Sequence, residues 1–143
     1  VRDISQVKFG KDHLRFANSP KNSTLIANVM AWVQSKQAAK ALDVLNAIQR
    51  AHFVEGSPLG CKHDLVNIIE QQKLSPPNKV FKEELTSDAQ YVVADIEEMQ
   101  EFMGTTSFPA MLLVNGEKAT LLNHQLYLNN PDAIVEAVAL ELK

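Results

Sequence analysis

The stretch GTTSFPAMLLVNGEKATLL, residues 104–122, differs in character from the rest of the sequence. A loop ending at Pro109 leads into residues 110–114, a compact apolar run with the length of a strand. Asn115-Gly116 is a strong hairpin-turn dipeptide, and KATLLNH supplies a returning strand. We therefore predict a β-hairpin that follows a proline-containing loop.

Most of the chain before and after this hairpin is predicted to be helical. Apolar residues recur at helical spacing, and capping or breaking residues mark where the helices begin and end. Ser23, Asp64 and either Thr86 or Ser87 are candidate N-caps, and Gly104 lies where a helix C-terminus favours a left-handed residue. The predicted helices are one from residue 23, one over 38–53, one from residue 64, a short one over 77–85, one over 88–103, and a last one from Pro131 to residue 142.

A lone hairpin leaves a physical problem. Two strands are marginally stable in water without more strands or a helical cover. Residues 110–114 are apolar on both sides of the strand, which suits a sheet covered on both faces. The sequence contains no other convincing strand. We therefore expect either that the hairpin lies entirely on helices, or that its partner strands come from a second subunit or from a missing upstream segment.

Composition and charge describe a soluble globular protein. The 143 residues fit one domain with a real core, and 45% of them are hydrophobic. The formal net charge is −3, and the basic residues are scattered, so neither nucleic acid nor an anionic membrane is expected as a partner. No apolar run approaches the ~20 residues of a membrane span, and the N-terminus does not resemble a signal peptide.

The cysteine count limits the redox chemistry of the chain. Cys61 is the single cysteine, which excludes an intrachain disulfide and a dithiol centre within this sequence. A reducing compartment is favoured, and we predict a cytoplasmic location. The chain opens on Val1 without an initiator Met, so we expect that it does not start where its gene does.

Three segments together resemble a known family. They are NAIQRAHFVEGSPL at 46–59, LVNIIEQQKLSPPNKVFKEELTSDAQ at 65–90, and MGTTSFPAMLLVNGEKATLL at 103–122. Their order and spacing from Asn18 onward resemble the DsbA-like branch of the thioredoxin superfamily, in particular its FrnE-like and protein-disulfide-isomerase-like members. The third segment resembles the cis-proline loop and C-terminal β-hairpin of that branch.

The resemblance implies an α/β fold that is mostly helical by content. It implies an irregular arm over 1–22, a helical insertion domain over 23–103, and the C-terminal half of a thioredoxin-like domain over 104–143. Family members begin with a β-α-β unit that carries Cys-x-x-Cys at a helix N-terminus, where the helix dipole favours the thiolate. This sequence has no such unit, so the resemblance implies a truncated chain and no catalytic residue within it.

The resemblance also implies a substrate-binding loop made of Ser107, Phe108 and Pro109. The Phe108–Pro109 bond would be cis, and the backbone of Ser107 and Phe108 would pair with a polypeptide or thiol substrate as an added strand. Without the resemblance, Pro109 would simply begin a strand. Phe108 stands where the family most often has Val or Thr, which bears on substrate preference.

The other candidate groups have ordinary structural explanations. Cys61 with Lys62 and His63 suggests a reactive thiol, but the resemblance places it in the helical insertion, away from a redox centre. Cys61, His63 and His52 lack the ligand number and spacing of a zinc site, so no metal and no cofactor are predicted. The remaining groups are expected on solvated helix faces or in the core, namely the acidic groups Glu83-Glu84, Asp95 and Glu97-Glu98, and the apolar Met30 and Trp32.

Three hypotheses for function stay open at this point. The chain is part of a thiol-disulfide oxidoreductase whose cysteines lie upstream, or it is a non-catalytic binding module that completes its sheet through a homo-oligomer. A glutathione-dependent isomerase of related architecture is the third.

Overall fold

A computed structural model describes residue 10 and residues 22–143 of the chain. The chain divides into two compact units, one ending at Ile96 and one containing Glu97–Lys143, and each is described by itself. Helix α5 (Ser87–Met103) contributes residues to both. Within the described residues, no helix is both long enough and apolar enough to cross a membrane.

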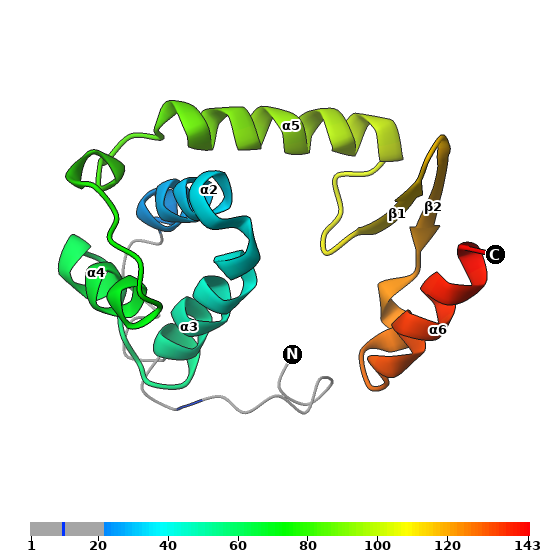
Figure 1. Cartoon of the computed structure of the whole chain (residues 1–143), viewed down its shortest axis with the longest axis horizontal. Helices are drawn as coiled ribbons and strands as arrows, with labels where there is room; N and C mark the ends of the chain where they lie inside the picture. Colours follow the sequence, from blue (N-terminus) through cyan, green and yellow to red (C-terminus); the bar gives the residue numbers. More distant parts are fainter. Residues whose placement is uncertain (1–9, 11–21) are drawn as a thin grey trace. The chain divides into compact units, whose positions relative to one another are not determined.

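The first unit is built from three helices around one core. Helices α2 (Thr24–Gln37), α3 (Ala41–Phe53) and α4 (Lys62–Gln71) pack together, and the short 3-10 helix η2 (Ala38–Lys40) joins the first two (Figure 1). Val44, Ile48 and Ala51 recur every three or four residues, so they form the buried stripe of α3. The core consists of Val29, Val33, Val44, Ile48, Ala51, Leu59, Leu65, Ile69, Leu74 and Val80, with Met30 and Trp32 packed against it as expected.

Two helix starts differ from those predicted, and one cap does. Helix α2 begins directly after Ser23 as predicted, but the Ser23 side chain makes no capping hydrogen bond. The amide of Thr24 instead donates to the Asn22 side chain, with 2.8 Å between Thr24 N and Asn22 Oδ1. Helix α4 begins after Cys61, and Asp64 lies inside its first turn, where a negative charge favours the helix N-terminus. The predicted helix over 38–53 starts as η2 and becomes α-helical only at Ala41.

The predicted helix over 77–85 does not form. Only a single 3-10 turn, η3 (Asn78–Val80), is present, and the chain beyond it is held by a buried amide. Asn28 of α2 is fully buried, and its Nδ2 lies 2.9 Å from Glu84 O and 3.4 Å from Lys82 O. Its Oδ1 accepts the amide of Thr86 at 2.8 Å. One side chain thus bonds three backbone groups of residues 82–86, which are unavailable for helical hydrogen bonds.

A lysine joins the α2–α3 connection to the end of α4. Lys40 Nζ lies 2.8 Å from the carbonyl oxygen of Gln72, the residue after α4. A cation at this position satisfies a terminal carbonyl and complements the helix dipole.

We expect Lys40→Met to lower the free energy of unfolding by about 1 kcal/mol, the value of a typical intramolecular hydrogen bond. Urea denaturation measures the change. Lys36→Met is the matched control, because Lys36 is exposed and should change the free energy by less than about 0.5 kcal/mol. Equal effects of the two substitutions would contradict a specific role for Lys40.

Helix α5 begins and ends as its sequence predicts. The Thr86 hydroxyl oxygen lies 3.3 Å from the amide of Ala89, which makes Thr86 the capping side chain. At the other end, Gly104 has φ +69°, its amide bonds Glu101 O, and the amide of Thr105 bonds Gln100 O. These two bonds define a Schellman motif, so the helix stops at Met103. Its apolar side chains are largely exposed, including Ile96, Met99 and Phe102.

The second unit contains the predicted hairpin. Strands β1 (Met111–Asn115) and β2 (Lys118–Leu122) are antiparallel, with Leu113 opposite Thr120. The turn lies one residue later than the Asn-Gly dipeptide predicted, because Asn115 is the last residue of β1 and the two loop residues are Gly116 and Glu117. Gly116 has φ +61°, which fits the first loop position of a type II′ turn.

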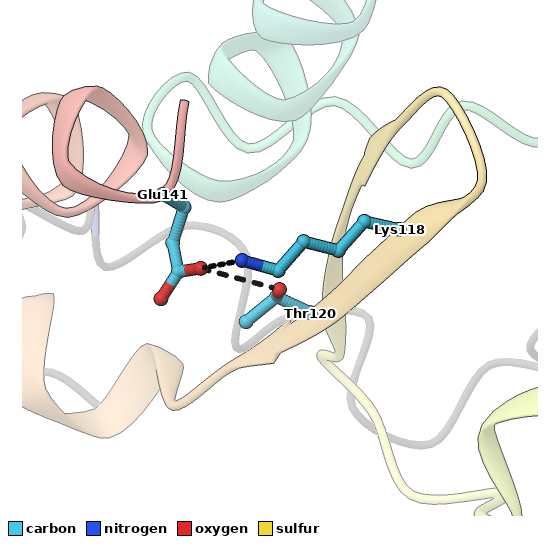
Figure 2. Close-up of polar contacts among 3 residues, drawn as sticks. All are labelled: Lys118, Thr120 and Glu141. Atoms are coloured by element: carbon cyan, nitrogen blue, oxygen red, sulfur yellow. Dashed lines mark hydrogen bonds and ion pairs between the residues drawn. The ribbon is translucent and has the colours of Figure 1, made fainter. Parts of the chain in front are cut away.

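The last helix contacts one face of this hairpin. A 3-10 helix, η4 (His124–Tyr127), leads from β2 to α6 (Asp132–Glu141), which follows Pro131. Glu141 Oε2 lies 3.1 Å from Lys118 Nζ and 3.5 Å from the Thr120 hydroxyl (Figure 2). The Lys118 side chain is 66% exposed, so this ion pair adds little stability to the contact between α6 and the hairpin.

Candidate substrate-binding loop

The start of the loop over 104–110 is held by hydrogen bonds at the end of α5. The Schellman motif of α5 sets the position of Thr105, and the hydroxyl of Thr105 then lies 3.1 Å from the amide of Ser107. A threonine hydroxyl that accepts an amide two residues later forms a local turn. Thr105 was not among the predicted site residues, although a threonine directly after a helix-ending glycine is the signal for such a turn.

The predicted site residues lie next to one another on this loop and are exposed. Phe108 is 89% exposed, and Ser107 and Pro109 are exposed as well. The Phe108–Pro109 peptide bond is cis. Among the described residues, no hydrogen bond involves the backbone of Phe108 or Pro109. The loop therefore presents the apolar ring of Phe108 and the unpaired backbone carbonyl of the same residue to solvent.

These features are suited to recognition rather than to bond breaking. An exposed aromatic ring can bury a large apolar area on contact with a partner. Backbone groups that are unpaired in the free chain can bond an extended peptide as an added strand. The loop itself contains hydroxyl groups but no thiol, carboxylate or imidazole.

Cys61 lies in the other unit and is exposed. It is the N-cap residue of α4 and has extended backbone angles. Its neighbour Lys62 is directed elsewhere, since its ammonium group bonds Asn78 Oδ1 and lies 5.4 Å from the ring centre of Phe81. His63 is exposed on α4.

The remaining polar candidates do not assemble into a site. His52 is in the last turn of α3, and its Nδ1 lies 2.8 Å from the carbonyl oxygen of Ser57, just beyond that helix. Over residue 10 and residues 22–143, no three His, Cys, Asp or Glu side chains are grouped as a metal would require. The five acidic residues singled out in the sequence all lie on exposed positions, namely Glu83, Glu84, Asp95, Glu97 and Glu98.

The fold is shared with solved structures of a disulfide reductase. The chain is similar to the cytosolic disulfide reductase DsbM from Pseudomonas aeruginosa, with a TM-score of 0.79 and 23% sequence identity. The match covers 99% of this chain and 72% of that one. A second structure of the same protein, with GSH, matches with a TM-score of 0.79 and 22% identity, over 99% and 71% of the two chains.

No family model matches the sequence, and no curated protein matches it. The similarity to known proteins therefore rests on the solved structures alone, and at 22–23% sequence identity it shows a common fold. The two-stranded sheet and the helices of this chain are consistent with a DsbA-like, thioredoxin-like α/β fold, in agreement with the resemblance seen in the sequence.

Proposed function

We propose that this chain is the larger part of a thiol-disulfide oxidoreductase of the DsbA type, with its redox cysteines in a segment outside these 143 residues. The observation that carries the proposal is the fold shared with a cytosolic disulfide reductase over 99% of this chain. The 28% of that reductase left uncovered by the match leaves room for such a segment. Placement in the FrnE-like branch is part of the proposal and rests on the sequence resemblance.

The chemistry requires two thiols. A thiolate attacks one sulfur of a substrate disulfide, forming a mixed disulfide and releasing the other sulfur as a thiolate, which takes up a proton. A second thiolate of the enzyme then attacks the mixed disulfide, so the substrate leaves fully reduced and the enzyme dithiol becomes a disulfide. This sequence has only Cys61, so the complete cycle needs cysteines from elsewhere.

In this scheme the chain supplies recognition. The Ser107–Phe108–Pro109 loop would contact the polypeptide or thiol substrate, with the Phe108 ring as an apolar anchor. Glutathione is the proposed reductant, because one neighbouring structure contains GSH. Two glutathione molecules would return the enzyme disulfide to the dithiol and leave as glutathione disulfide. A reducing, cytoplasmic compartment fits this direction of transfer.

Insulin reduction tests the proposal. The protein as its gene encodes it should reduce insulin disulfides in the presence of glutathione, and replacing both upstream cysteines by alanine should abolish the activity. The 143-residue chain should show no activity above buffer, with Cys61→Ala indistinguishable from it. A gene product with a Cys-x-x-Cys and no reductase activity would sink the proposal.

A further inference from the structure

The carboxyl end of α3 needs hydrogen-bond donors from outside the helix. The last four carbonyl groups of an α-helix have no N–H group of a following turn to bond. The loop directly after α3 supplies part of this need, since the amide of Ser57 bonds Ala51 O at 2.8 Å. The carbonyl of Phe53, the last helical residue, has a partner of a different kind.

This partner is Gly10, far upstream of α3 in the sequence. The amide nitrogen of Gly10 lies 2.8 Å from Phe53 O. Gly10 is half-buried and belongs to the same compact unit as α3. An N–H donor also complements the partial negative charge at a helix C-terminus. Gly10 therefore caps α3 from a distant part of the chain.

The contact leaves no space for a side chain at residue 10. A Cβ atom at this position would lie 1.9 Å from Val54 O and 2.7 Å from the carbonyl carbon of Val54. Both are backbone atoms, which cannot rotate aside as the end of a side chain can. Proline is excluded twice, because it also lacks the N–H group that Phe53 O accepts. Only glycine fits this position.

A chance contact between a loop and a helix would not have these properties. Such contacts are made by side chains and tolerate most substitutions, whereas both observations at Gly10 concern backbone atoms only. Gly60 provides a comparison within the same unit. A Cβ atom at Gly60 would meet nothing within 4 Å. The close approach at Gly10 is therefore a property of that position and not of loop glycines in general.

The chain is also held on the other side of the helical core. Asn28 of α2 bonds the backbone of residues 82–86, directly before α5. Gly10 lies before α2 in the sequence, and residues 82–86 lie after α4. The core helices thus bond the chain backbone both upstream and downstream of the bundle.

We propose that Gly10 is a docking point that fastens the incoming chain to the carboxyl end of α3, and that no other residue can replace it. A segment that precedes residue 10 then starts from a fixed position on the helical unit. The inference does not depend on the proposed function, because it concerns a contact within the helical unit alone.

Hydrogen exchange followed by NMR tests the docking point in the protein as its gene encodes it. The Gly10 amide should exchange about ten-fold or more slowly than the intrinsic rate of its sequence, as expected for a bonded amide. Gly10→Ala should return the amide of residue 10 to its intrinsic rate. Gly60→Ala is the matched control and should leave the exchange of Gly10 unchanged. The amide of Ile48, a buried residue of α3, reports whether each variant is folded.

Two results would overturn the inference. Exchange of the Gly10 amide at its intrinsic rate in the unaltered protein would mean that the incoming chain is not docked on α3. Undiminished protection of residue 10 in Gly10→Ala would mean that a Cβ is accommodated and that glycine is not required. The measurement on the unaltered protein decides the docking even if Gly10→Ala does not fold.

Discussion

Replacing Asn28 by alanine is expected to lower the free energy of unfolding of the helical unit by about 3 kcal/mol. The amide is fully buried and bonds two carbonyls and one N–H of residues 82–86. Removing one partner leaves the others without their bonds, which costs about 1–3 kcal/mol for a buried group. Urea denaturation followed by the fluorescence of Trp32, which lies in the same helix and is the single tryptophan, measures the loss.

Two further variants make this expectation specific. Asn67→Ala removes an exposed amide from α4 and should change the free energy by less than about 0.5 kcal/mol. Asn28→Asp keeps an acceptor for the Thr86 amide but has no donor for the carbonyls of Lys82 and Glu84, so we expect it to be at least as destabilising as alanine at neutral pH. An Asn28→Ala variant as stable as Asn67→Ala would show that residues 82–86 are held by other contacts.

Replacing Phe108 by alanine is expected to lower kcat/KM for polypeptide disulfides by about ten-fold or more in the gene-encoded protein. Burying a phenylalanine ring contributes about 1.5–3 kcal/mol, and the ring is 89% exposed in the free chain, so the energy is available only on binding. For the same reason the free energy of unfolding should change by less than about 0.5 kcal/mol. Insulin reduction and urea denaturation measure the two quantities.

The controls separate recognition from chemistry. Leu126→Ala changes an apolar side chain of η4 that is 69% exposed, and it should leave kcat/KM unchanged. Reduction of a small disulfide that cannot reach Phe108 should be equally fast in the Phe108→Ala protein and in the unaltered protein. Equal losses for insulin and the small disulfide would mean that Phe108 acts on the redox centre and does not anchor a polypeptide.

Features set by neighbours in the sequence were predictable. The hairpin, α5 and the helix end at Gly104 depend on alternation, helical spacing and a glycine with positive φ, all of which can be read from a few consecutive residues. The exposed loop with Ser107, Phe108 and Pro109 was identified by resemblance, and its role in binding stays a prediction. Thr105 was not predicted as a site residue, because its hydroxyl shapes the loop backbone by accepting the Ser107 amide, whereas the resemblance identified the residues expected to contact substrate.

Features set by distant residues were not predictable. The helix predicted over 77–85 was wrong because its polar backbone groups are bonded by Asn28, which precedes them by more than fifty residues in the sequence. Nothing in the local pattern of residues 81–85 indicates that competition. The predicted start of α4 was wrong for a different, local reason. The helix begins at Lys62 and not after Asp64, and an aspartate is favourable both as an N-cap and within the first helical turn, so the sequence alone does not distinguish the two positions.

The way α5 ends has an evolutionary consequence. Gly104 and two backbone hydrogen bonds stop the helix, so the side chains of Thr106, Ser107 and Phe108 take no part in terminating it. Substitutions at these three positions leave that helix end intact, while each changes what the loop presents to a partner. Related proteins could therefore diverge in specificity by drift at this loop, with the helix end inherited unchanged.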